Sequence, residues 1–165
     1  MEKRRVMYRV TLKKINILPI AVEELSLIKQ SEKILKNINL DISSKGITFI
    51  IGPNGAGKTQ LLRCLHGLEK YSGLIKYGDQ KFSEEIKLMQ SFVFQQPTLL
   101  RRNTIENIIF FSKNRKIKNY YDNAVNLLKL LKLEQALLKP ALSLSSGEKQ
   151  RLALARALSI NPKLF

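Results

Sequence analysis

The stretch Gly52-Pro53-Asn54-Gly55-Ala56-Gly57-Lys58-Thr59 fits the pattern G-x-x-x-x-G-K-[ST] in full. The residues before it, 47–51, read Ile-Thr-Phe-Ile-Ile, an apolar, β-branched run that predicts a strand buried on both faces of a parallel sheet. Residues 58–66 predict a helix, because leucines recur on one face and Gly67 follows as a stop. The pattern therefore stands between a strand and a helix, the context in which it forms a phosphate-binding loop.

Each residue type in this loop has a physical task in binding a triphosphate. Glycines let the backbone turn tightly and bring its N–H groups against phosphate oxygens, and the following helix adds unpaired N–H groups and a positive dipole end. Lys58 supplies a charge for the β- and γ-phosphates, and Thr59 offers a hydroxyl to Mg²⁺. The predicted ligands are ATP and Mg²⁺. The predicted nucleotide-binding residues here are Gly52, Pro53, Asn54, Gly55, Ala56, Gly57, Lys58, Thr59 and Gln60.

The composition is close to globular averages apart from its charge. The chain has 165 residues, enough for one domain or slightly more, with 44% apolar and 25% charged residues. A net charge of +16 is compatible with binding nucleic acid, an anionic membrane surface or a phosphate ligand. Because the basic residues are spread along the chain and are not interleaved with aromatic residues, nucleic acid is not the expected partner.

The sequence also bears on the compartment. No apolar run approaches the roughly 18 to 20 residues that span a bilayer, and no secretory signal follows the charged start. The single cysteine, Cys64, cannot form an internal disulfide, and no Cys/His cluster has metal-ligand spacing. These observations predict a reducing, cytoplasmic compartment.

Short apolar runs punctuated by glycine and asparagine predict an α/β fold with a partly parallel core sheet. Residues 1–21, which are basic and end in a Leu-Pro break, are expected to precede the domain as an extension. Besides residues 47–51, strands are expected at 22–28, 34–42, 73–78 and 91–95. The pattern is helical between 104 and 133, and a last helix is expected from about 147 to 159.

A second motif, Leu-Ser-Ser-Gly-Glu-Lys-Gln-Arg, occupies residues 144–151. Locally it predicts a capping box, in which Ser145 is the N-cap and Glu148 is the third helical residue. Together with the phosphate loop it resembles the signature of ABC transporter ATPases, usually Leu-Ser-Gly-Gly-Gln. The tail at 150–158 and Gln95, which is similar to the family's Q-loop glutamine, strengthen the resemblance. It implies a P-loop NTPase fold over residues 22–165, with N-terminal strands and a helical subdomain at about 96–150.

The resemblance also implies a mechanism. Two such domains would pair head to tail, so that Ser145, Gly147 and Glu148 of one subunit face the nucleotide bound to the phosphate loop of the other. Gln95 would be the catalytic contact, touching Mg²⁺ or the attacking water, and Thr59 and Gln95 would be the metal-contacting residues. The remaining implied partners are a membrane permease and, indirectly, a substrate-binding protein. The chain would lie peripherally on the cytoplasmic face of the membrane.

The sequence departs from the family pattern at several positions. Ser146 replaces the first signature glycine, Gln60 stands where a threonine usually follows the Mg²⁺ ligand, and Lys29 occupies the place of an adenine-stacking aromatic. Tyr8 is the alternative stacking residue. The chain ends at Phe165, before the family's Walker B aspartate and catalytic glutamate. The expectation is therefore a truncated domain that binds nucleotide weakly and does not turn it over.

Residues 96–108, which follow Gln95, are similar to importer ATPases of the tungstate, molybdate and related oxyanion class. The expected function is thus the ATP-binding subunit of an ABC importer, an ATP hydrolase by family, with tungstate or a related oxyanion as the solute. Two other interpretations stay open. One is a soluble, non-transport ABC protein acting on nucleic acid or the ribosome, and the other is an inactive fragment.

Overall fold

The computed structural model describes residues 16–43 and 45–165. Most of the predicted extension 1–21, with Tyr8, therefore lies outside the described residues. The described residues divide into two compact units, one built on 16–43, 45–60 and 70–82 and the other on 61–69 and 83–165. Each unit is described by itself.

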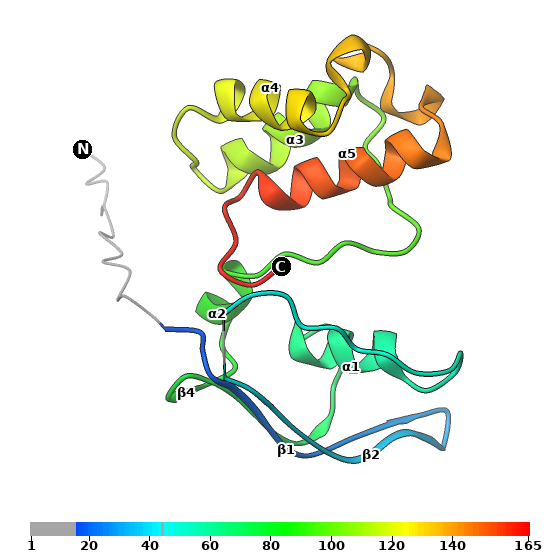
Figure 1. Ribbon diagram of the computed structural model, residues 1–165, viewed down its shortest axis with the longest axis vertical. Helices are drawn as coiled ribbons and strands as arrows, with labels where there is room; N and C mark the ends of the chain where they lie inside the picture. The colour runs from blue at the N-terminus through cyan, green and yellow to red at the C-terminus, as the bar shows by residue number, and fades with distance from the viewer. Residues whose placement is uncertain (1–15, 44) are drawn as a thin grey trace, which may run out of the picture. The chain divides into compact units, whose positions relative to one another are not determined.

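The first unit is built on a four-stranded antiparallel sheet in the order β2-β1-β3-β4 (Figure 1). The strands are β1 (Ile20–Lys29), β2 (Glu32–Ile42), β3 (Ser72–Tyr77) and β4 (Gln80–Lys81). The central strand β1 pairs with β2 on one side and with β3 on the other, so that Ile20 lies opposite both Ile42 and Tyr77.

A bulge in β1 decides which of its residues are buried. Ile20 and Val22 are buried, but the next buried residues are Leu25 and Leu27, so the alternation skips one position. The register shifts between Val22 and Leu25, where Glu24 adopts a φ of +51°. An extra residue in one strand restores the inward direction of the following side chains, as β-bulges do.

The prediction of a parallel strand at 47–51 is wrong. The segment has no regular secondary structure, and Ile47, Phe49 and Ile51 are 83%, 78% and 90% exposed. A strand is stable only beside a partner that completes its hydrogen-bond ladder, and no strand of the described chain pairs with 47–51. Residues 91–95 likewise form no strand, and the parallel pairing seen in the described residues is an isolated bridge between Gln90 and Leu164.

The helices are α1 (Lys58–Leu65), α2 (Glu84–Leu88), α3 (Thr104–Asn114), α4 (Tyr120–Leu130) and α5 (Ser146–Leu158). Two short 3-10 turns, Glu134–Ala136 and Ala141–Ser143, link α4 to α5. The predicted helical stretch 104–133 is thus interrupted, and Lys116 and Asn119 in the interruption have positive φ. In α1 the buried residues are Leu61, Cys64 and Leu65, whereas Leu62 is exposed.

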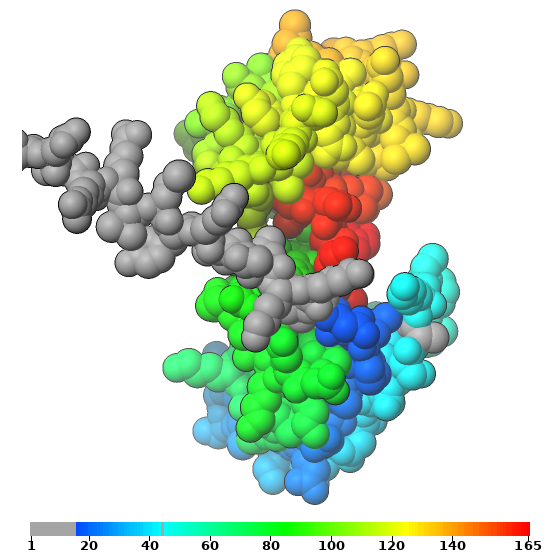
Figure 2. Space-filling view, turned by 90° about the vertical axis from the view of Figure 1, so that its left-hand side faces the viewer, coloured from blue at the N-terminus to red at the C-terminus, as the bar shows by residue number. Residues whose placement is uncertain are grey.

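Helices α3, α4 and α5 pack around one apolar cluster (Figure 1). The cluster consists of Ile105, Ile108, Ala124, Leu128, Leu133, Ala136, Ala141, Leu144, Leu152 and Ala155. On the face drawn in Figure 2, α4 and the residues after it, in yellow and orange, lie at the outer surface of the second unit. No helix among the described residues is both long and apolar enough to cross a membrane.

Candidate functional site

The glycine-rich loop runs from Gly52 to the first residue of α1, and it is largely exposed. The loop turns at residues 53–56, where the N–H of Ala56 donates to the carbonyl of Pro53 at 3.3 Å. Gly55 and Gly57 have φ of +82° and +83°, in the left-handed region that favours glycine. A Cβ on Gly57 would also lie 2.7 Å from Cδ2 of Leu35 in β2. The sheet therefore supports the loop at Gly57, and the loop needs glycine there for two independent reasons.

Lys58 begins α1 and folds back over the loop. Its ammonium donates to the carbonyls of Gly52 at 2.8 Å and Pro53 at 2.6 Å. A phosphate oxygen is a stronger acceptor than a neutral carbonyl, because the hydrogen bond is then charge-assisted at both ends. The loop thus holds a cation beside backbone N–H groups at the start of a helix, an arrangement suited to a phosphate group.

The capping box predicted at the second motif is confirmed. The Ser145 hydroxyl accepts from the N–H of Glu148 at 3.3 Å, and the Glu148 carboxylate accepts from the N–H of Ser145 at 2.8 Å. The backbone hydrogen bond from Ser145 is the main reason that the pKa of Glu148 lies below its ordinary value. Ser145, Ser146 and Gly147 are exposed, so that the start of α5 is accessible.

Gln95 lies in the irregular segment after Gln90, with its side chain exposed. Its backbone carbonyl accepts a short hydrogen bond from the side-chain amide of Gln150 in α5. The structure therefore brings two of the predicted features together within the second unit, the Gln95 segment and the motif helix. The phosphate loop belongs to the first unit.

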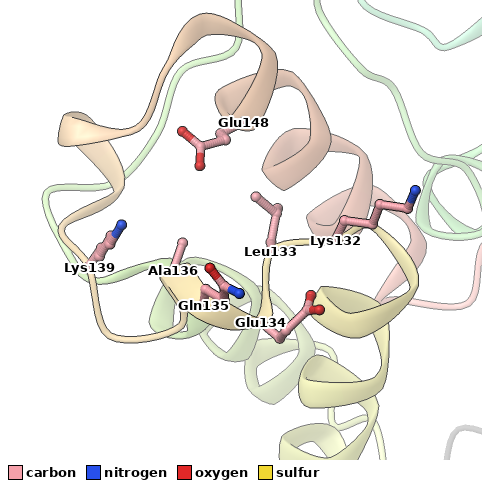
Figure 3. Close-up of a pocket in the computed structure, with 7 residues that line it drawn as sticks. All are labelled: Lys132, Leu133, Glu134, Gln135, Ala136, Lys139 and Glu148. Atoms are coloured by element: carbon pink, nitrogen blue, oxygen red, sulfur yellow. The ribbon is translucent and has the colours of Figure 1, made fainter.

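A cavity of about 420 Å³ opens between the segment after α4 and the start of α5 (Figure 3). Figure 3 shows Glu148 on one side and Lys139 with Gln135 on another. The lining residues are Lys132, Leu133, Glu134, Gln135, Ala136, Lys139 and Glu148, so the lysines and glutamates balance in charge. This balance gives the cavity no selectivity for an anion.

The sequence assigned no role in the site to three side chains that lie near it. Gln150 and Arg156 of α5 donate to carbonyls of the Gln95 segment, and only the resemblance of residues 150–158 pointed to this helix. His66 lies beside Gln90, with Nδ1 2.9 Å from the amide oxygen, and it stacks on Phe92. Among the residues that the structure describes, no group of three His, Cys, Asp or Glu side chains could hold a metal ion.

Comparison with known proteins finds matches over most of this chain. A family model described as ABC transporter matches residues 35–165. A methionine import ATP-binding protein of Clostridium tetani is 36% identical over 157 residues, which are 88% of this chain and 49% of that protein. A tungstate uptake system ATP-binding protein of Peptoclostridium acidaminophilum is 43% identical over 128 residues, 76% of this chain and 59% of the relative. This chain therefore spans about half to three fifths of the length of these relatives.

Two further comparisons extend the match. A phosphonates import ATP-binding protein of Fusobacterium nucleatum is 36% identical over 165 aligned residues, covering 87% of this chain and 67% of that protein. The structure of cbiO1 from Clostridium perfringens, part of the ABC transporter complex cbiONQ, superposes with a TM-score of 0.76 at 29% identity. That superposition covers 92% of this chain and 64% of the solved one.

Proposed function

Because the chain belongs to the ABC transporter family, we propose that it is the ATP-binding part of an importer's ATPase subunit. The observation that carries this proposal is the phosphate loop. Glycines at 55 and 57 hold left-handed conformations, and the Lys58 ammonium is hydrogen-bonded across the loop. The relatives named above are import ATP-binding proteins for methionine, tungstate and phosphonates, which supports import over export.

In the proposed nucleotide site, the residues from Gly52 to Gln60 surround the phosphates and Lys58 pairs with the β- and γ-phosphates. Thr59 and Gln95 would contact Mg²⁺. Both offer neutral oxygen atoms, the hard donors that this ion prefers beside phosphate oxygens. The ion would neutralise part of the triphosphate charge, and the backbone N–H groups of the loop would orient the chain of phosphates.

Hydrolysis and transport are proposals for the whole protein. The exposed start of α5, with Ser145, Gly147 and Glu148, would face the γ-phosphate bound to a second, head-to-tail subunit. The N–H groups of the first turn of α5 that lie outside the capping box, such as that of Gly147, suit this contact, because a helix N-terminus favours an anion. A permease in the membrane and, indirectly, a substrate-binding protein would complete the importer, and this chain would lie on the cytoplasmic face.

Nucleotide binding is tested by titrating Mg-ATP into the chain and following the heat of binding. Lys58→Ala is expected to weaken binding about ten- to one-hundred-fold, because it removes a charged hydrogen-bond donor from the phosphates. Lys81→Ala, which removes the same charge from exposed strand β4, is the matched control and should change the Kd by less than about twofold. Binding that is unaffected by Lys58→Ala would contradict the proposed site.

For the solute, we propose tungstate or a related oxyanion. The support is the similarity of residues 96–108 to this class and the 43% identity with a tungstate uptake ATP-binding protein. The test is uptake of tungstate, methionine and phosphonate by cells with and without the gene. Loss of tungstate uptake, restored by the intact gene, is the expected result. Loss of methionine or phosphonate uptake alone would reject tungstate as the solute and keep the importer.

A further inference from the structure

The segment from Ser91 to Thr98 has no strand on either side within the described chain, yet its backbone is held at several points. Ser91 donates through its N–H to the carbonyl of Leu164 at 2.9 Å and through its hydroxyl to the carbonyl of Ala157 at 2.7 Å. Further along, the carbonyls of Gln95 and Thr98 accept from side chains of α5. Backbone groups without a ladder need other partners, and here one helix supplies most of them.

The two donors from α5 differ in strength. Gln150 is exposed and donates through its neutral amide to the carbonyl of Gln95. Arg156 is half-buried and donates through Nη1 to the carbonyl of Thr98 at 2.7 Å. A charge-assisted bond of this length is the stronger of the two.

Arg156 is also held from its other side. Its guanidinium lies 4.9 Å from the ring centroid of Phe111 in α3, within the range of a cation–π contact. No carboxylate in the described part of the chain forms an ion pair with it, so its charge is balanced by the Thr98 carbonyl and the ring face. Burial accordingly lowers the pKa of Arg156 from its ordinary value. Because the Arg156 guanidinium is partly desolvated, losing either the Thr98 carbonyl or the Phe111 ring would leave its charge without enough compensating contacts. We therefore expect Arg156 to keep both contacts.

The far end of the segment is fixed as well. Asn107 of α3 is fully buried and its side chain accepts from the N–H of Leu100 at 2.8 Å and donates to the carbonyl of Asn103 at 3.0 Å. Residues after Thr98 are thus tied to α3, while Gln95 and Thr98 are tied to α5. The backbone around Gln95 is therefore expected to move together with α3 and α5, which hold it.

We propose that Gln150 and Arg156 are positioning residues that clamp the carbonyls of Gln95 and Thr98 to α5, so that the Gln95 segment and the capped start of α5 move together. The inference rests on the proposed function, in which Gln95 and the start of α5 contact nucleotide. It adds a physical link between those two contacts. A displacement of Gln95 by Mg-ATP would reach Ser145 and Gly147 along a hydrogen-bonded helix, a rigid element of the kind that can carry coupling between sites.

The clamp is tested first by hydrogen–deuterium exchange of the chain without nucleotide. Gln150→Ala and Arg156→Lys are expected to speed exchange of the hydrogen-bonded amides of Ser91 and Leu100, on either side of the clamped carbonyls, about tenfold, while the amides at 152–158 inside α5 stay protected. Lysine keeps the charge but loses the planar fork and the stacking on Phe111. Arg151→Lys, on the same helix but exposed and without a bond to the segment, is the matched control. Unchanged exchange at Ser91 and Leu100, or equal acceleration by Arg151→Lys, would overturn the clamp.

A second arm tests the coupling. Mg-ATP is expected to slow exchange of the amides of Glu148 and Lys149 in the wild-type chain, and this response should fall by at least half in Gln150→Ala with the Kd within twofold. A full response in that variant, or none in the wild type once it is saturated, would reject the coupling. If Arg156→Lys also speeds exchange of the amides at 152–158, that variant has loosened α5 itself, and the clamp is then judged from Gln150→Ala by the same criteria. A wild-type chain that binds no Mg-ATP would refute the proposed function, while the nucleotide-free exchange still decides the clamp.

Discussion

Gly55 and Gly57 have nearly the same backbone conformation but different surroundings. A Cβ at Gly55 would meet nothing within 4 Å, whereas one at Gly57 would lie 2.7 Å from Leu35 Cδ2 and 3.3 Å from the Ile34 carbonyl. An alanine at either position must adopt the left-handed conformation, which lowers the free energy of unfolding by about 1–2 kcal/mol. Only Gly57→Ala adds a steric clash, which lowers it by about 1–3 kcal/mol more.

We therefore expect Gly57→Ala to lower the free energy of unfolding by at least about 1 kcal/mol more than Gly55→Ala, in urea melts of the two variants. Gly57→Ala should also weaken Mg-ATP binding more, because the loop must shift away from β2. Equal stability of the two variants would mean that the contact with Leu35 is relieved without cost.

Ser145 and Ser146 are neighbouring serines with different tasks. Only Ser145 accepts the hydrogen bond from the N–H of Glu148 that caps α5. Ser145→Ala is expected to cost about 1 kcal/mol of unfolding free energy, whereas the exposed Ser146→Ala should change it by less than about 0.5 kcal/mol. Thermal and urea unfolding of both variants measure the difference, and an equal loss would contradict the cap.

At the scale of the element, the cap of α5 depends on pH. The pKa of Glu148 in the folded chain lies below its ordinary value of 4.5, mainly because its carboxylate accepts the hydrogen bond from the Ser145 N–H. A carboxylate of lowered pKa stabilises the fold above its unfolded pKa, and this contribution is lost as the pH falls through the folded value.

We expect the protection of the Ser145 amide against exchange, read by NMR relative to the intrinsic rate at each pH, to fall as the pH is lowered below about 4.5. Glu148→Gln keeps an acceptor without a charge and should remove this pH dependence. A Ser145 amide that stays protected in acid, or an unchanged profile in Glu148→Gln, would reject the role of the ionised carboxylate.

At the scale of the whole molecule, the unpaired segment 47–51 is the most exposed apolar part of the described chain outside the helices. Ile47, Phe49 and Ile51 are exposed at alternate positions of this segment, which has no ladder partner in the described chain. Such a segment can pair with the same segment of another copy, because its N–H and C=O groups and its apolar side chains are both accessible.

We expect Phe49→Thr to reduce concentration-dependent association of the 165-residue chain, measured by light scattering. Leu138→Thr is the control, since Leu138 is 75% exposed in a loop that offers no extended edge. If association falls equally in both variants, its cause is general surface hydrophobicity and not the segment 47–51.

The sequence by itself determined the features that are built from near neighbours. The left-handed glycines, the Lys58 bonds and the Ser145–Glu148 cap join residues at most six positions apart, so residue types and spacing were sufficient to predict the loop and the cap. Only the tertiary structure decided that 47–51 lacks a pairing strand, that β1 bulges at Glu24, and that Gln95 and Thr98 are held by α5. The reason is physical: a ladder or a carbonyl clamp needs a partner far along the chain, and an apolar run carries the tendency to be a strand without carrying the partner that completes it.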